Sequence, residues 1–383
     1  MLYLDYCATT PMNDEVMESI VKVMQRHYGN PSSIHRIGME AERLLSKSKE
    51  VIAGAIDCKP EEMVFTSGGT ESNNLAIKGA ARAYRGRGRH LITSAIEHSS
   101  VYESFRRLEE EGFQVTYLPV DSSGAVCMEE LKQALREDTI LVSLMHVNNE
   151  TGRIQPVEQA GRLLANYPKI LYHVDAIQSL GKLPVMPARF GADLMSASAH
   201  KIEGPKGAGF LYVREGLKLQ PQLDGGGQEG GIRSGTENVP LIVGMAKAVR
   251  LAVDRQAANS SRLYRMREEL ANRIREIPGL YVSGTASGEG MAPHIIHFTY
   301  PGMKAEVVVH ALEKEDVYIS TRSACSSGET KPSRVLLAMG MDRERAASGL
   351  RVSFSANETS EELSRFGDLL EQTILSFNAT MKG

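Results

Sequence analysis

The residues best suited to chemistry surround Lys201, in the segment Ser196-Ala-Ser-Ala-His-Lys-Ile-Glu-Gly-Pro-Lys-Gly-Ala-Gly209. A lysine amine can form a Schiff base with an aldehyde, and the neighbouring serine and histidine can help to hold the molecule that carries it. The glycines let the backbone pass close to such a cofactor. Pyridoxal 5'-phosphate (PLP) needs this combination. A lysine before a glycine turn is also common on protein surfaces, so the segment alone leaves both interpretations open.

A carboxylate follows an apolar run upstream of Lys201. Residues 170–174 (Ile-Leu-Tyr-His-Val) predict a buried parallel strand that ends near Asp175. Ligands bind at this end of the strands in open α/β sheets. A buried, ionised aspartate is costly unless it has a cationic partner, and the protonated pyridine nitrogen of PLP is such a partner. A helix-capping or salt-bridged aspartate is the alternative.

A glycine turn supplies a candidate anion site. Residues 63–66 predict a short strand, 67–70 (Ser-Gly-Gly-Thr) a tight turn, and 71–83 a helix. A helix N-terminus that follows such a turn binds anions, because its backbone N–H groups have no partner within the helix. The glycine spacing matches neither the dinucleotide nor the P-loop motif. The turn is therefore weak support by itself.

Alternating strand and helix patterns must position these motifs. Apolar runs predict further buried strands at 115–120, 140–145 and 210–213. Asn13 predicts the start of a helix whose buried face carries Val16, Ile20, Val23 and Met24. This alternation indicates an α/β fold, with a sheet between two layers of helices.

The pattern changes near residue 254. A long amphipathic helix follows and ends at Pro278-Gly279. Beyond it we predict a strand at 295–299, a helix at 305–315, a strand at 350–354 and a helix from 361 to about 377. We therefore predict a large PLP-binding α/β domain over residues 13–254. A small α+β domain would follow over 255–383, carrying Cys325, and residues 1–12 could pack onto it.

The motifs, taken in order, resemble the cysteine desulfurase family, within the class V branch of fold-type I PLP enzymes. The resemblance extends over nearly the whole chain. The matching segments are residues 3–11, 29–33, 66–74, 97–98, 146–152, 173–178, 196–209, 233–236 and 323–326. The resemblance implies a mostly parallel sheet flanked by helices in the large domain, and a smaller α+β C-terminal domain.

The resemblance also implies how the cofactor would be held. Lys201 would form the Schiff base, Asp175 would bind the pyridine nitrogen, and Gln178 the ring hydroxyl. His98 would stack on the ring and help to move protons. The family's phosphate-binding positions match Gly69, Thr70, Ser198 and His200, joined by Thr236 from the other subunit of a homodimer.

The substrate implied by the resemblance is L-cysteine. Asn149, which also belongs to the cofactor site, and Arg351 would bind it, with Arg351 forking its α-carboxylate. Cys325 would take the sulfur as a persulfide and leave L-alanine. Its segment, residues 320–332, is polar and contains glycine and proline, which is typical of an exposed, mobile loop. The segment's length resembles the long-loop branch of the family.

Several partners and alternative functions remain open at this point. The persulfide would go to a sulfur-acceptor protein, either an iron–sulfur scaffold or a tRNA-thiolating enzyme. A selenocysteine lyase would use the same cofactor residues. A class V aminotransferase would keep Lys201 and Asp175 but would not need Cys325 on a mobile loop. A non-catalytic, PLP-stabilised scaffold for sulfur-transfer proteins would have no need of the full set of reactive residues.

Composition limits the function classes further. The 383-residue chain has a formal net charge of −3, and this overall charge indicates no direct nucleic-acid partner. Its four cysteines show neither a CxxC pair nor zinc-ligand spacing, which argues against a disulfide framework and a metal site. No stretch is typical of a signal peptide or a membrane span. We expect a soluble, cytoplasmic enzyme with no membrane partner.

Overall fold

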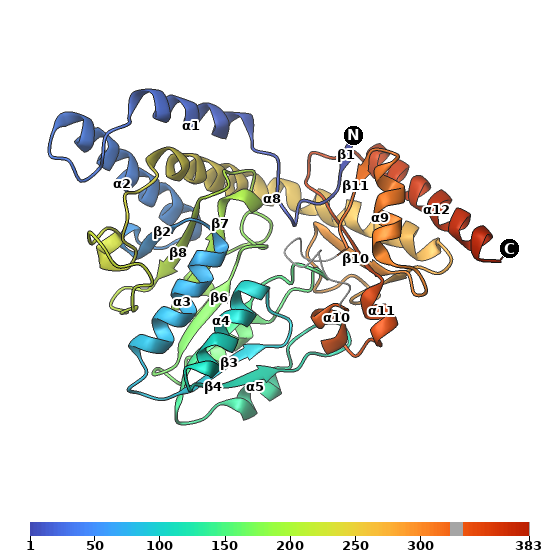
Figure 1. The fold of residues 1–383 in the computed structure, drawn as a ribbon, viewed down its shortest axis with the longest axis horizontal. Helices are drawn as coiled ribbons and strands as arrows, with labels where there is room; N and C mark the ends of the chain where they lie inside the picture. Colours follow the sequence, from blue (N-terminus) through green and yellow to red (C-terminus); the bar gives the residue numbers. More distant parts are fainter. Residues whose placement is uncertain (322–331, 383) are drawn as a thin grey trace.

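The computed structural model describes residues 1–321 and 332–382. It contains two bodies of secondary structure, and one long helix, α8, runs through both (Figure 1). The strands are β1 (Leu2–Tyr3), β2 (Met63–Thr66), β3 (His90–Ser94), β4 (Gln114–Leu118), β5 (Thr139–Met145), β6 (Leu171–Asp175), β7 (Leu194–Ser198), β8 (Gly209–Val213), β9 (Tyr281–Val282), β10 (Ile295–Thr299), β11 (Val317–Tyr318) and β12 (Gly349–Ser353). The helices are α1 (Asp14–Arg26), α2 (Arg36–Ile56), α3 (Gly69–Ala83), α4 (Ser99–Glu110), α5 (Met128–Ala134), α6 (Val157–Leu164), α7 (Pro187–Phe190), α8 (Val239–Glu276), α9 (Ala305–Glu313), α10 (Arg334–Ala338), α11 (Arg343–Ala347) and α12 (Ser360–Lys382).

The first body is built on a sheet of seven strands in the order β2-β8-β7-β6-β5-β3-β4. The pairs from β4 through β7 are parallel, whereas β8 runs antiparallel to both β2 and β7. The central strands are buried throughout, as expected for a sheet covered on both faces. The predicted mostly parallel α/β sheet is confirmed.

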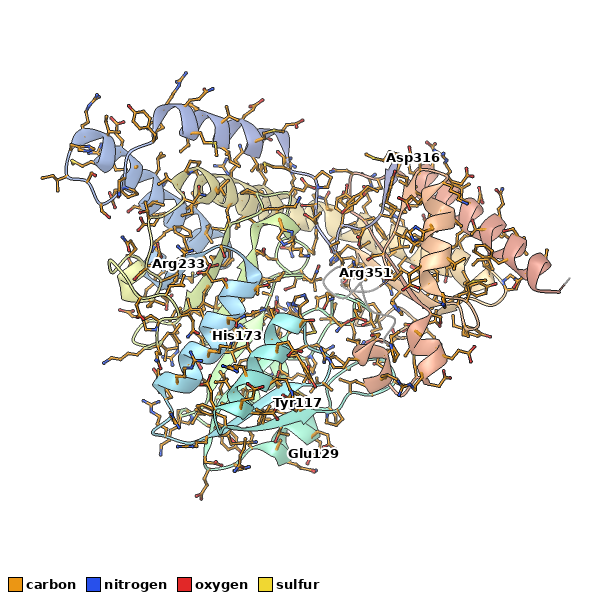
Figure 2. The ribbon with its side chains drawn as sticks, in the orientation of Figure 1. Tyr117, Glu129, His173, Arg233, Asp316 and Arg351 are labelled. Atoms are coloured by element: carbon orange, nitrogen blue, oxygen red, sulfur yellow. The ribbon has the colours of Figure 1, made fainter. Side chains whose placement is uncertain are left out.

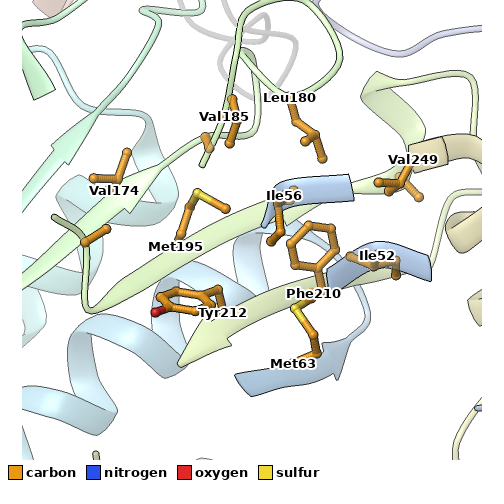
Figure 3. Packing of buried hydrophobic residues seen from close by; sticks show 14 of the residues in the cluster. Ile52, Ile56, Met63, Val174, Leu180, Val185, Met195, Phe210, Tyr212 and Val249 are labelled. Atoms are coloured by element: carbon orange, nitrogen blue, oxygen red, sulfur yellow. The ribbon is translucent and has the colours of Figure 1, made fainter. Parts of the chain in front are cut away.

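Alternate residues of the strands face two helical layers. Phe210 and Tyr212 of β8 point to the same core as α1, α2 and α8, whereas Leu211 points to the core of α3 and α4. Figure 3 shows Ile52 and Ile56 of α2 packed beside Phe210. Phe210 is 1% exposed, so its replacement by alanine would cost about 3 to 5 kcal/mol of stability.

The second body contains the antiparallel sheet β12-β10-β9, covered by α9, α12 and the second half of α8. The start of the chain joins it, because β1 pairs with β11 and Leu4 is buried in this core. The first part of α8 packs against the first core up to Val253, and its buried residues from Leu263 onward belong to the second. The division after residue 254 lies within α8 and stays a prediction.

Three local predictions need correction. Asn13 does cap α1, by accepting a hydrogen bond from the backbone of Glu15, but Met24 is 53% exposed and does not share the buried face. The strand predicted at 115–120 is β4, which lies at the sheet edge, ends at Leu118 and is only partly buried. Helix α3 begins at Gly69, two residues before the predicted start, because the second glycine already has helical geometry.

None of the helices within residues 1–321 and 332–382 combines the length and the apolar character that a membrane span requires.

Candidate active site

One cavity of about 560 Å³ brings most of the predicted site residues together. It opens at the carboxyl ends of β6 and β7 and at the N-terminus of α3, where ligands bind in such sheets. The predicted residues that line it are Gly69, Thr70, His98, Asn149, Asp175, Gln178, Ser198, His200, Lys201 and Arg351. Thr236 is exposed and does not line this cavity. Cys325 lies outside the described residues.

Asp175 ends β6 with its carboxylate held from two sides. The backbone N–H of Ile177 donates to Oδ1 at 3.0 Å, and the Asn73 amide donates to Oδ2 at 2.8 Å. Burial raises the pKa of Asp175, although these hydrogen bonds and the charge of Lys201 oppose the rise. A cationic group in the cavity would favour the ionised form. The carboxylate therefore fits a protonated pyridine nitrogen.

His98 is connected to Asp175 through Asn73, which the motif analysis did not single out. The Asn73 Nδ2 also donates to Ser100 Oγ at 2.9 Å, and Ser100 Oγ lies 2.9 Å from His98 Nδ1. The backbone N–H of Ser100 donates to the same ring nitrogen at 3.2 Å, so Nδ1 is an acceptor and Nε2 carries the proton. Burial, with Lys201 and Arg334 nearby, lowers the pKa of His98 to about 4. The imidazole is neutral at physiological pH.

Lys201 extends from a 3₁₀ turn, Ala199–Lys201, that directly follows β7. Its Nζ donates to the backbone carbonyls of Cys7 at 2.5 Å and Ala8 at 2.8 Å. Gln178 Nε2 donates to the same Cys7 carbonyl at 3.1 Å. The backbone at Cys7 and Ala8 therefore holds both the candidate Schiff-base lysine and Gln178, the residue expected at the ring hydroxyl.

The N-terminus of α3 forms a cradle for an anion. Gly68 has a φ of 148°, a conformation that glycine adopts without strain. A Cβ on Gly69 would lie 2.2 Å from Ile177 Cδ1, so a side chain at this position would force Ile177 to shift. Ser198 Oγ is buried and has no hydrogen-bond partner among the described residues. An unpartnered buried hydroxyl is costly, and a phosphate that receives its hydrogen bond would remove this cost. The residues present fit PLP.

The opposite wall carries Arg351, which lies between the two bodies (Figure 2). This side chain is on β12 and is 1% exposed. One terminal nitrogen donates to Asp5 Oδ1 at 2.7 Å and the other to the Asn149 carbonyl at 2.8 Å, while the buried Nε has no partner among the described residues. Asp5 was part of a recognised motif, but no local signal pointed to this contact.

The comparisons with known proteins agree with this geometry. The family model described as Aminotransferase class-V matches residues 2–366. The chain belongs to the class-V aminotransferase family. It is 44% identical over 374 residues to a relative named "Cysteine desulfurase IscS" from Dictyoglomus turgidum, covering 97% of this chain and 94% of the relative. A second relative, named "NifS/IcsS protein homolog" and from Lactobacillus delbrueckii, is 45% identical over 96% of this chain and 95% of its own.

A solved structure agrees as well. The one titled "NIFS-LIKE PROTEIN" is 38% identical and superposes with a TM-score of 0.91, covering 98% of this chain and 99% of its own. The relatives of this chain within the class-V family include proteins named cysteine desulfurase, in agreement with the family that the sequence motifs resemble.

Proposed function

We propose that this protein is a PLP-dependent cysteine desulfurase, which converts L-cysteine to L-alanine and retains the sulfur as a persulfide on Cys325. The observation that carries the proposal is the shared cavity, in which Lys201 and the buried carboxylate of Asp175 lie beside an anion cradle with an unpartnered hydroxyl. A solved structure titled "SspA in complex with cysteine" adds support, with 35% identity, a TM-score of 0.81 and coverage of 93% of this chain and 99% of its own.

The chain's residues divide the work of binding and proton transfer. PLP, when bound, supplies an electron sink for the bonds at the substrate Cα. Asp175 holds the ring nitrogen protonated, and Gly69, Thr70, Ser198 and His200 hold the phosphate. Lys201 would hold the cofactor, and its free amine would take the proton from the substrate Cα. His98 is neutral and can donate from Nε2.

Sulfur transfer needs a group that binds the α-carboxylate of the substrate and a protein thiol that accepts the substrate's sulfur. Arg351 binds the α-carboxylate of L-cysteine, and Asn149, whose carbonyl accepts from Arg351, lines the same wall. The thiolate of Cys325 attacks the substrate sulfur, so that an S–S bond forms while the Cβ–S bond breaks, and the bonding electrons return to the substrate carbon. One proton delivered to Cβ and one returned to Cα complete L-alanine.

The assembled enzyme is a homodimer in this proposal. Thr236 is exposed and absent from the cavity of its own chain, which fits a role in the partner's phosphate site. The persulfide passes to a sulfur-acceptor protein for iron–sulfur cluster assembly or tRNA thiolation. The chemistry takes place in solution, in the cytoplasm.

A direct assay tests the proposal. The purified protein, loaded with PLP, is incubated with L-cysteine, and both alanine and protein-bound persulfide are measured. We expect both products in the wild type. Cys325→Ala should still bind PLP and react with the substrate amine, but release little alanine and carry no persulfide. Undiminished alanine formation by Cys325→Ala would instead support the lyase or aminotransferase alternative.

A further inference from the structure

A negative side chain lies where the phosphate is expected to bind. Glu71 is the third residue of α3 and lines the same cavity as Ser198 and Lys201. Its Oε2 accepts a hydrogen bond from the backbone N–H of Ser67 at 2.7 Å, which shapes the glycine turn. A carboxylate stabilises a helix N-terminus by itself. However, it repels a phosphate that approaches the same end, so the cradle needs a nearby positive charge.

Arg233 supplies this charge through a forked contact. Its Nε donates to Glu71 Oε1 at 2.8 Å, and a terminal nitrogen lies 3.4 Å from Oε2. The two side chains are only 23% and 21% exposed, so solvent screens the pair less than an ordinary surface pair. Burial favours the neutral form of Glu71, but the hydrogen bonds from Arg233 and Ser67 outweigh it and hold the pKa below its ordinary value. Glu71 is therefore ionised at neutral pH.

The segment that carries Arg233 is hydrogen-bonded to β2, the strand that precedes the glycine turn. Glu229 Oε2 accepts hydrogen bonds from Lys49 Nζ at 2.8 Å and from the backbone N–H of Phe65, in β2, at 3.0 Å. Figure 2 labels Arg233 in the loop beside α3. Among the described residues, Arg233 is the group that forms an ion pair with Glu71. Three residues later, the same segment reaches the exposed Thr236.

We propose that Arg233 is a positioning residue for the cofactor phosphate, which neutralises Glu71 and thereby lets the N-terminus of α3 accept a doubly charged anion. The inference rests on the proposed function, because it takes the phosphate of PLP as the ligand of the cradle. It assigns Arg233 no contact with the substrate or with the cofactor ring. Its effect should therefore depend on the phosphate alone.

A pair of ligands isolates this effect. Apo-protein is titrated with PLP and with pyridoxal, which has the same ring and aldehyde but no phosphate, and binding is followed by equilibrium dialysis and cofactor absorbance. Arg233→Gln should bind PLP roughly 10- to 100-fold more weakly, the size expected for one uncompensated charge at an effective dielectric constant of about 20. Its affinity for pyridoxal should not change. Arg233→Lys keeps the charge and should lose less.

The Glu71 variants complete the test. Glu71→Gln keeps an oxygen for the Ser67 N–H but removes the charge, so it should bind PLP at least as tightly as the wild type. The double variant Glu71→Gln/Arg233→Gln should recover most of the affinity lost by Arg233→Gln. Equal losses for PLP and pyridoxal in Arg233→Gln, or no recovery in the double variant, would overturn the inference and make Arg233 a packing residue. A wild type that binds neither ligand would instead overturn the proposed function, and the inference with it.

Discussion

The two walls of the cavity are built in different ways. The cofactor-facing wall comes from a single sheet: Asp175 and Ser198 end neighbouring strands, and the turn after β2 presents the N-terminus of α3. The substrate-facing wall joins distant segments, because Arg351 on β12 contacts Asp5 near the start of the chain and Asn149 after β5. The first wall is therefore fixed mainly by the fold of one body, although Cys7 and Ala8 also hold Lys201, whereas the second depends on how the two bodies meet.

This difference predicts where substitutions act. On the cofactor-facing wall, Asn73 connects Asp175 to His98 through Ser100, so each group is held by a neighbour on the same wall. On the substrate-facing wall, the alignment depends on the ion pair between buried Arg351 and partly buried Asp5, and removing Asp5 would leave the charge of Arg351 buried without this partner. Changes on the first wall should alter cofactor binding, and changes on the second should alter substrate binding.

Lys201→Ala should have the largest effect. The variant loses both the covalent link to PLP and the base at the substrate Cα, and general base catalysis alone contributes up to about 10⁴-fold in rate. Borohydride reduction should fix PLP to the wild type but not to the variant, as measured by mass spectrometry of the intact chain. PLP fixed to a different lysine in the wild type would show that the cofactor assignment is wrong.

Arg351→Lys should come next, and its effect should fall on the substrate. Lysine keeps the charge but cannot fork a carboxylate, so we expect KM for L-cysteine to rise roughly 100-fold, or about 2.7 kcal/mol. The absorbance of bound PLP should stay unchanged. Cysteamine, which lacks the α-carboxylate, is the matched ligand, and its reaction with bound PLP should be equal in both proteins. A matching loss with cysteamine would place Arg351 in the cofactor-facing wall instead.

The two walls also differ in how far the sequence predicts them. The Lys201 segment, the strand ending at Asp175 and the glycine turn are local patterns, and each one places its residues at the end of a strand. The Arg351–Asp5 pair joins positions 346 residues apart, and no periodicity encodes such a contact. Asn73 lies on α3 one turn after the glycines, so its position follows from the helix, but its partners on α4 and β6 do not. Met24 shows a further limit, because helical spacing marks a face without saying how wide its buried part is.

Thr236→Ala should have a smaller effect on PLP binding. It tests whether Thr236 of one subunit completes the phosphate site of the other. Loss of one hydrogen bond to a charged group costs about 1.5 to 3 kcal/mol of PLP affinity. A mixed dimer of Thr236→Ala and Lys201→Ala chains would combine one intact Lys201 with one intact Thr236 in the same site. Co-refolding should therefore restore activity of up to one site per heterodimer. No recovery in a proven heterodimer would confine Thr236 to its own subunit.

At Glu97, a buried carboxyl group next to His98 in the chain, we expect an effect on stability rather than on binding. Its Oε1 accepts from Ser94 Oγ at 2.5 Å and from the Met145 N–H at 3.1 Å, while Oε2 is buried without a partner among the described residues. Burial raises the pKa of Glu97 to about 8 from its ordinary 4.5. Between these two values the folded protein retains a proton that the unfolded chain releases. The contribution of Glu97 to the free energy of unfolding therefore falls as pH rises, by about 1.4 kcal/mol per pH unit.

Glu97→Gln isolates this contribution, because glutamine has nearly the same shape as the protonated acid but cannot ionise. Buried histidines act in the opposite direction at low pH: burial lowers the pKa of His173 to about 3, so its contribution to stability grows as pH rises toward 6.5. The contributions of the histidines are the same in both proteins, so they cancel in the difference in stability between variant and wild type. Urea unfolding at intervals from pH 5 to 9 should show the variant's relative stability increasing up to about pH 8 and constant above it. A difference that does not change with pH would mean that Glu97 is ionised in the fold, and that the first body tolerates a second buried carboxylate in addition to Asp175.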